Sequence, residues 1–305
     1  MSTTPILPDA HPTRARYRTE TIDGVDIFYR EAGDPSAPTI LLLHGWPSSS
    51  FSFRELIPVL AEHFHVIAPD YPGLGFSGTP KHTEFDYSFS HIADILWALC
   101  DAKGVDAAAL YLTDFGCCIG WLMADRSPER VTAILSQSGF VANVGVTNAE
   151  DEEWQANLAT YHDPTPERRE RLKEALGFEY TKYTYVEGAC DLELVAPDTY
   201  HLDYALFQRP DQGDIQVDLL LSYTDFILHG FPKAQAYLRE HQPPVLCVWG
   251  ANDPYAPKEG IEAITDLVPN TEVHLFDAGH FPLETHVREI GATINEFLLR
   301  NVKAG

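Results

Sequence analysis

The sequence lacks the long apolar run that a membrane-spanning helix requires. No stretch approaches the roughly 20 consecutive apolar residues that cross a bilayer. The first 18 residues are polar and proline-rich, without the apolar core of a secretory signal. We therefore expect no membrane partner, and we expect these 18 residues to form an irregular lead-in along the surface.

Basic residues are also scarce. The chain has 21 Lys and Arg against 45 Asp and Glu, which gives a formal net charge of −24. A strongly negative protein repels the phosphate backbone of nucleic acids, so we do not expect a nucleic-acid partner. The few basic residues do not cluster, which also disfavours a strongly anionic substrate. We expect a small, neutral, apolar substrate.

Cysteine is limited to five residues, an odd number, and the paired C-x-x-C spacing of a zinc site is missing. Neither a disulfide framework nor a metal centre is predicted. Three of the five lie in apolar runs, as buried free thiols commonly do. A reducing cytoplasm is the expected location.

Short apolar, β-branched runs alternate with helix-length segments over most of the 305 residues. Near-continuous apolar strands separated by helices are typical of a mostly parallel sheet that helices cover on both faces, an α/β fold. Strands are predicted at 26–30, 39–44, 65–69, 108–113, 131–137, 245–250 and 272–276, and helices lie between most of them, as at 91–103.

The alternation breaks between about residues 140 and 239, in a stretch rich in Tyr, Pro, Asp and Glu. Helices are predicted within it at 165–176 and 217–228, and the strand–helix pattern resumes at Pro244. An insertion of this size at one point of a sheet indicates a helical cap over the strand ends. The predicted division is a core of residues 1–139 and 234–305 and a cap of residues 140–233.

Three chemically reactive side chains follow predicted strands. Asp114, Asp253 and His280 come shortly after the fourth, sixth and seventh strands. Ligands of open α/β sheets bind at the carboxyl ends of the strands, so we expect these side chains to meet. A nucleophile, a carboxylate and a histidine in this chain order match the order of an α/β-hydrolase triad.

The run GCCIG at residues 116–120 allows a second alignment of the strand–helix turn, or register, in which a cysteine and not Asp114 is the nucleophile. That register would extend the strand through Asp-Phe-Gly-Cys, and Asp and Gly are poor strand residues. Counting from Asp114 leaves fourteen residues to Pro128, about four helical turns, whereas Cys118 leaves ten. The sequence therefore predicts Asp114 on the strand–helix turn, with Cys117 and Cys118 packed inside the following helix.

Five motifs make the sequence similar to the α/β-hydrolase superfamily over nearly its whole length. They are HGWP at 44–47, DYPGLGFS at 70–77, TDFGCCIG at 113–120, WGANDP at 249–254 and AGHFPLE at 278–284. Within the superfamily the sequence resembles the branch with an aspartate nucleophile, which contains epoxide hydrolases and haloalkane or haloacetate dehalogenases. The resemblance implies that Asp114 forms an alkyl-enzyme ester and that His280, oriented by Asp253, activates the water that hydrolyses it.

The same resemblance implies the remaining parts of the site. The backbone N–H groups of Trp46 and Phe115 are expected to form the oxyanion hole, and no metal or organic cofactor is implied. His44 is expected to shape the oxyanion loop through hydrogen bonds. The residues assigned to substrate binding are His44, Pro47, Trp154 and Tyr185.

Epoxide opening produces an alkoxide, which a phenol with a pKa near 10 can protonate. Tyr223 lies thirty residues before Asp253 and resembles the position of an epoxide-activating tyrosine; ordinary packing within the cap is its alternative role. Tyr161 is the candidate for the second acid, and Tyr185 and His162 are alternative candidates for the same role. A dehalogenase instead needs N–H donors for the halide, and the phenylalanine beside the nucleophile has none.

The sequence therefore predicts a cofactor-independent hydrolase that opens an epoxide to a vicinal diol. One alternative is a dehalogenase with the same nucleophile, in which Trp46 and Trp154 contribute to the halide site. Another is a non-catalytic binding protein with a hydrolase fold. An esterase with a Ser or Cys nucleophile is possible only if the placement of Asp114 on the strand–helix turn is wrong. A homodimer through the cap surface is compatible with the sequence.

Overall fold

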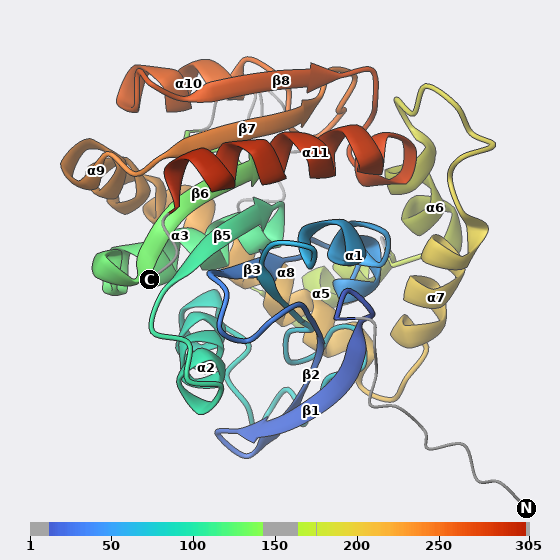
Figure 1. Ribbon diagram of the computed structural model, residues 1–305. Coiled ribbons are helices and arrows are strands. Elements are labelled where there is room, and N and C mark those ends of the chain that lie inside the picture. The colour runs from blue at the N-terminus through green and yellow to red at the C-terminus, as the bar shows by residue number, and fades with distance from the viewer. Residues whose placement is uncertain (1–11, 143–163, 175, 303–305) are drawn as a thin grey trace, which may run out of the picture.

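The computed structural model describes residues 12–142, 164–174 and 176–302 (Figure 1). Its centre is an eight-stranded sheet with the order β1-β2-β4-β3-β5-β6-β7-β8. The β1–β2 and β2–β4 pairs are antiparallel and the other five pairs are parallel. The strands are β1 (Arg16–Ile22), β2 (Val25–Ala32), β3 (Thr39–Leu43), β4 (His65–Pro69), β5 (Ala108–Thr113), β6 (Val131–Gln137), β7 (Val245–Gly250) and β8 (Glu272–Phe276).

Helices cover both faces of the sheet, because the central strands are apolar on both sides. Leu41 and Leu43 of β3 pack into one buried cluster, while Ile40 and Leu42 pack into another, as the alternation of side chains along a strand requires. Figure 1 shows α11 crossing in front of the strands. The helices outside the insertion are η1 (Ser50–Phe53), α1 (Leu56–Leu60), α2 (Phe89–Ala102), α3 (Phe115–Arg126), η2 (Pro128–Arg130), α9 (Phe231–His241), α10 (Gly260–Leu267) and α11 (Leu283–Asn301).

The mostly parallel, eight-stranded sheet with flanking helices is confirmed. All seven strands predicted by residue range are present, and five of them have the predicted bounds. The expectation of an irregular lead-in is wrong from Arg16 onward, where β1 begins. This edge strand is held by its backbone pairing with β2 and six of its seven side chains are exposed, so it shows no apolar pattern.

Five described helices come between β6 and β7, and the first four of them lie over the carboxyl ends of the strands. Trp46, in the loop after β3, stacks on Phe207, and Phe281, in the loop after β8, stacks on Tyr185. The assignment of residues 140–233 as a separate cap domain stays a prediction. These first four helices are α5 (Pro166–Glu174), α6 (Phe178–Val186), α7 (Pro197–Phe207) and α8 (Gln212–His229). No helix in the described ranges is both long enough and apolar enough to span a membrane.

A buried carboxylate connects β2 to its neighbours. The Nε2 atom of His65 on β4 donates to Glu31 Oε1 at 3.1 Å, and Lys103 Nζ lies 3.2 Å from the same oxygen. Arg18 on β1 forms an ion pair with the other carboxylate oxygen. The hydrogen bond from His65, assisted by Lys103 and Arg18 and opposed by burial, lowers the pKa of Glu31 to about 2.

Replacing this carboxylate is expected to destabilise the fold in a pH-dependent way. Glu31→Gln should lower the free energy of unfolding by roughly 1–3 kcal/mol at pH 7. Because the folded-state pKa lies below the ordinary value of 4.5, the stabilisation is present above that pH and is lost as the pH falls towards 2. Urea unfolding of the wild-type protein and the variant should show that the difference between their free energies of unfolding is about 1 kcal/mol smaller at pH 3.5 than at pH 7. An unchanged difference would contradict the ionic role of Glu31.

Candidate active site

Asp114 occupies the turn between β5 and α3 in a strained conformation, with φ of 49° and ψ of −118°. Few residues other than glycine adopt a positive φ, and such a conformation costs about 1–3 kcal/mol. Two glycines allow the close packing around the turn. A Cβ atom on Gly116 would lie 2.2 Å from the carbonyl oxygen of Leu43, and one on Gly45 would lie 2.5 Å from Asp114 Cβ. The predicted register, with Asp114 on the turn, is confirmed.

The two cysteines of the competing register lie inside α3. Cys117 and Cys118 are fully buried. Burial raises the pKa of both thiols well above the ordinary value, and the nearby charge of Asp114 raises it further. The Sγ atom of Cys117 contacts the carbonyl oxygen of Phe140 at 3.3 Å. A buried thiol with a raised pKa is a poor nucleophile, so both cysteines act as packing residues.

The structure brings Asp114, His280 and Asp253 together. His280 Nε2 lies 3.9 Å from Asp114 Oδ2, and His280 Nδ1 donates to Asp253 Oδ2 at 2.9 Å. Asp253 also accepts a hydrogen bond from Ser138 Oγ at 2.5 Å and from two backbone N–H groups of its own loop, at 2.8 and 3.1 Å. These donors fix Asp253, and Asp253 in turn fixes the His280 ring with Nε2 facing Asp114.

The charges of these groups shift one another's pKa values. Burial alone would lower the pKa of His280, but the Asp253 carboxylate and, to a smaller extent, Asp114 raise it to about 9. Burial raises the pKa of Asp114, and this increase is opposed by His280 and by backbone hydrogen bonds. Burial of Asp253 is outweighed by His280 and the Ser138 hydroxyl, which lower its pKa. Both carboxylates thus favour the protonated form of the His280 ring.

Two backbone N–H groups converge on the Asp114 carboxylate. The N–H of Trp46 donates to Asp114 Oδ1 at 2.6 Å. The N–H of Phe115 also hydrogen-bonds this carboxylate. Both donors belong to rigid positions, one directly after β3 and one at the first residue of α3. Two backbone donors on one carboxylate are compatible with the predicted oxyanion hole.

The indole of Trp46 is engaged elsewhere. Its Nε1–H donates to Gln216 Oε1 on α8 at 3.0 Å, and the Gln216 amide donates to the carbonyl oxygen of Gly73 at 3.1 Å. The ring also stacks on Phe207 of α7. Trp46 therefore contributes a backbone donor to Asp114, while its side chain joins the oxyanion loop to the inserted helices.

Tyr223 packs against the residue that follows Asp114, and its predicted role as an acid stays a prediction. Its ring centroid is 5.2 Å from that of Phe115, the residue that follows Asp114. Tyr161, Trp154 and His162 lie outside the described residues, and their predicted roles stay predictions.

His44 and Pro47 are buried in the oxyanion loop. The ring of His44 stacks on Tyr71 at 4.0 Å, its Nδ1–H donates to the carbonyl oxygen of Gly45, and its Nε2 accepts from the N–H of Tyr71. Burial lowers the pKa of His44. With both nitrogens engaged, His44 supports the loop. Pro47 is buried and follows a cis peptide bond.

Tyr185 is separated from the reacting atoms by another ring. Its hydroxyl donates to Asp203 Oδ2 at 2.5 Å, and its ring stacks on Phe281 at 4.0 Å. Phe281 follows His280 directly and contacts its ring edge-on. Tyr185 thus positions the loop that carries His280, a role that its place in the sequence did not reveal.

Several residues at the site were not singled out from the sequence. The Tyr255 ring meets the His280 ring edge-on at 5.2 Å, and Tyr180 is a neighbour of Tyr255. Tyr180 also lies against Trp46. The proximity of Tyr255 to Asp253 was an available signal, whereas nothing in the sequence distinguishes Tyr180 from other tyrosines of the insertion. Within the described ranges, no group of three or more His, Cys, Asp or Glu side chains could hold a metal ion.

Comparison with known proteins supports the fold. The sequence profile of the α/β-hydrolase fold matches residues 38–287. The chain belongs to the α/β-hydrolase family. It is 38% identical over 289 residues to an uncharacterized hydrolase of Saccharomyces cerevisiae, an alignment that covers 93% of this chain and 97% of the yeast protein. It is also 35% identical to epoxide hydrolase A of Mycobacterium tuberculosis over 117 residues, 38% of this chain and 36% of that protein.

Solved structures show the same fold. A loop variant of the haloalkane dehalogenase DbeA from Bradyrhizobium elkanii superposes with a TM-score of 0.76 at 22% identity, over 94% of this chain and 97% of that one. The epoxide hydrolase CorEH superposes with a TM-score of 0.75 at 20% identity, over 94% and 99%. This α/β hydrolase therefore has structural neighbours among both dehalogenases and epoxide hydrolases, as the sequence motifs implied.

The raised pKa of His280 depends on its two carboxylate neighbours, which can be tested directly. Asp114→Asn is expected to lower the pKa of His280 below about 9, because it removes one negative charge. Asp253→Asn should lower it further, because it removes the stronger interaction and the hydrogen bond. An NMR titration of the His280 ring protons measures the pKa in each variant. Asp266→Asn, an exposed carboxylate on α10, is the matched control; an equal shift in that variant would contradict the assignment.

Proposed function

We propose that this α/β hydrolase opens an epoxide to a vicinal diol through a covalent ester on Asp114. The observation that carries the proposal is the carboxylate of Asp114 on the strained turn, between two backbone donors and the Nε2 atom of His280. A carboxylate nucleophile attacks an sp³ carbon to give an ester, which a second step must hydrolyse. The site contains a residue for each of these steps.

In the first step, Asp114 Oδ2 attacks a ring carbon of the epoxide. A new C–O ester bond forms, the epoxide C–O bond breaks, and its electron pair goes to the epoxide oxygen. Oδ2 suits this role because the Trp46 N–H engages Oδ1. The developing alkoxide takes a proton from a phenol. Tyr223 is the proposed donor, since its ring packs against Phe115 beside the nucleophile. Tyr161 remains the proposed second donor.

Formation of the ester changes the protonation of His280. The alkylated Asp114 carries no charge, so one of the two carboxylates that raise the pKa of His280 is lost. The pKa of His280 therefore falls, and the ring gives up its proton more readily after the first step than before it. Ester formation itself prepares the base that the second step needs.

In the second step, neutral His280 removes a proton from a water molecule that attacks the Asp114 carbonyl carbon. The resulting oxyanion is held by the N–H groups of Trp46 and Phe115, which already converge on this carboxylate. Asp253, at 2.9 Å from Nδ1, stabilises the imidazolium that forms. Collapse of the intermediate breaks the C–O ester bond, and the leaving alkoxide takes the proton of the carboxylic acid that forms on Asp114, which gives the diol and restores the Asp114 carboxylate.

Two features of the described residues support epoxide over halide chemistry, while Trp154, the other candidate halide donor, lies outside these residues. Haloalkane dehalogenases occur among the relatives of this chain, and the same nucleophile would serve them. A departing halide needs N–H donors, but Phe115 has none in its side chain and the Trp46 indole donates to Gln216. A neutral apolar epoxide also suits a chain with a net charge of −24.

Trapping the covalent ester tests the proposal. His280→Gln should stall hydrolysis, so that exposure to styrene oxide adds the whole mass of the epoxide to the peptide that contains Asp114. Intact and peptide mass spectrometry detect the adduct, and the double variant with Asp114→Asn should show none.

Parallel exposures separate the alternatives. An alkyl adduct from 1-bromohexane, without one from the epoxide, would indicate a dehalogenase. An acyl adduct on Cys118 from phenyl acetate would indicate an esterase and overturn the register. No adduct from any of the three compounds would count against an Asp114 ester.

The proposed role of Tyr223 makes a separable kinetic prediction. Tyr223→Phe should slow ester formation from an epoxide by about 10²-fold or more, because the alkoxide loses its acid. Hydrolysis of the preformed ester should be unchanged, because it uses His280. Single-turnover kinetics resolve the two rates. Tyr204→Phe on α7 serves as the matched control, and an equal slowing of ester hydrolysis in Tyr223→Phe would refute the acid role.

A further inference from the structure

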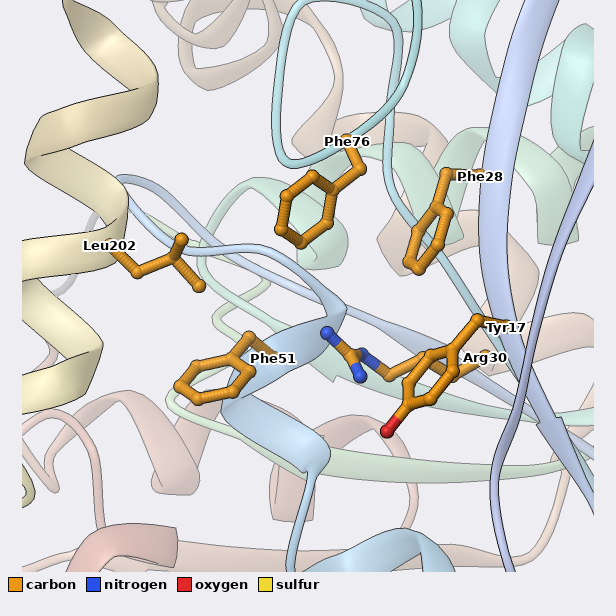
Figure 2. A pocket seen from close by; sticks show the side chains of 6 residues that line it. All are labelled: Tyr17, Phe28, Arg30, Phe51, Phe76 and Leu202. Carbon is orange, nitrogen blue, oxygen red and sulfur yellow. The ribbon is translucent and has the colours of Figure 1, made fainter.

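A pocket opens on the surface at the β1–β2 side of the molecule, apart from the candidate active site. It has a volume of about 370 Å³ and is lined by Tyr17, Phe28, Arg30, Phe51, Phe76 and Leu202 (Figure 2). These residues come from β1, β2, η1, the loop after β4 and helix α7. Four of the six are aromatic, and two of these are largely exposed, Tyr17 at 67% and Phe76 at 48%. None of the six takes part in the catalytic arrangement.

The guanidinium of Arg30 is the polar centre of this pocket. Arg30 is only 6% exposed, and its guanidinium carbon lies 5.0, 5.6 and 5.5 Å from the ring centroids of Tyr17, Phe28 and Phe51. Figure 2 shows it between Phe51 and Tyr17, with Phe76 and Phe28 on the other side of the pocket. A single charge among aromatic rings in an open pocket is a composition that can orient an apolar ligand by one polar group.

Within the described residues, Arg30 has no directly paired carboxylate, although the charge of Asp70 lies nearby. Its Nε–H donates to Ser50 Oγ at 3.1 Å, and the Tyr17 hydroxyl is its other hydrogen-bond partner. No carboxylate of the described residues forms an ion pair with it. Asp70 is near, but its two oxygens accept from the N–H groups of Ser50 and Phe76, each at 2.7 Å. Burial lowers the pKa of Arg30, the direction expected when desolvation exceeds the compensating charge.

We infer that this pocket, which we call the Arg30 pocket, binds a small organic monocarboxylate with an aromatic body. Arginine presents N–H groups in a plane that matches a carboxylate, and the surrounding rings provide stacking surfaces for a planar ligand. One guanidinium suits one negative charge. A phosphate dianion would need further cations and would be opposed by the net charge of −24.

The Arg30 pocket is distinct from the catalytic site but adjoins the same helices. β2 is separated from β5 by β4 and β3, so the two strands lie roughly 14 Å apart at the usual strand spacing. Leu202 closes one side of the pocket from α7 (Figure 2). Its neighbour Asp203 is buried and accepts the hydrogen bond from Tyr185. A bound carboxylate would therefore contact both the sheet and an inserted helix.

Binding of benzoate, measured by isothermal titration calorimetry, tests the inference. Wild-type protein should bind benzoate, while benzamide, its neutral counterpart, should bind at least about tenfold more weakly. Arg30→Gln should weaken benzoate binding to a similar extent. Phe76→Glu, at an exposed position, should do the same, because the new carboxylate either repels the ligand or pairs with Arg30. This second variant decides the result if circular dichroism shows that Arg30→Gln fails to fold.

Two controls locate the binding. Arg288→Gln removes an exposed arginine from α11 with the same change of charge, and Asp114→Asn alters the catalytic site; both should keep the wild-type affinity. The inference fails if benzoate does not bind, if folded Arg30→Gln or Phe76→Glu keeps full affinity, or if benzamide binds equally well. Loss of binding in Asp114→Asn would move the ligand to the catalytic site. Tighter binding of phenyl phosphate than of benzoate would overturn the assignment to a monocarboxylate.

Discussion

The site depends on one backbone constraint, the positive φ at Asp114, and on the packing that maintains it. The parallel pairing of β3 with β5 sets Leu43 opposite Leu112, so the loop after β3 and the turn after β5 meet at the same edge of the sheet. Gly45 and Gly116 then allow the two segments to approach within a distance that any side chain would prevent. The N–H of Trp46 reaches Asp114 only because of this approach, so the proposed nucleophile and its backbone donor are fixed by the same contacts.

The electrostatics of the site connect the two proposed chemical steps. While Asp114 is charged, it and Asp253 keep His280 in its protonated form, with a pKa of about 9. A protonated imidazole cannot act as a base, yet the first step does not require one. Alkylation removes the charge of Asp114 and with it part of the stabilisation of the imidazolium. Asp253 is held by Ser138 and two backbone donors and keeps its charge, so it can stabilise the proton when His280 takes it up again.

Sequence patterns predicted those features that follow from local composition or spacing. The buried strands appeared as apolar runs, and the triad appeared as polar residues at their ends. The length of α3 selected Asp114 over Cys118. β1 was missed because an exposed edge strand has no apolar pattern. The bond from Ser138 to Asp253, the bond from Trp46 to Gln216, and the stacking of Tyr185 on Phe281 join segments distant in the chain. No local sequence pattern indicates which aromatic ring or side-chain amide of the insertion will contact Trp46 or Phe281.

Asp70 shows how one motif residue can organise two sites at once. It is fully buried after β4, and its carboxylate accepts the N–H groups of Ser50 and Phe76. A Cβ atom on Gly75, which has a φ of 52°, would lie 2.0 Å from Asp70 Oδ2, so the loop folds closely around the carboxylate. The bond to Ser50 anchors the segment that begins at the oxyanion loop. The bond to Phe76 holds a wall of the Arg30 pocket, and Ser50 in turn accepts the Nε–H of Arg30. Because both oxygens of Asp70 accept backbone N–H groups, Asp70 stabilises these loops and acts on Arg30 through its charge, without a direct ion pair.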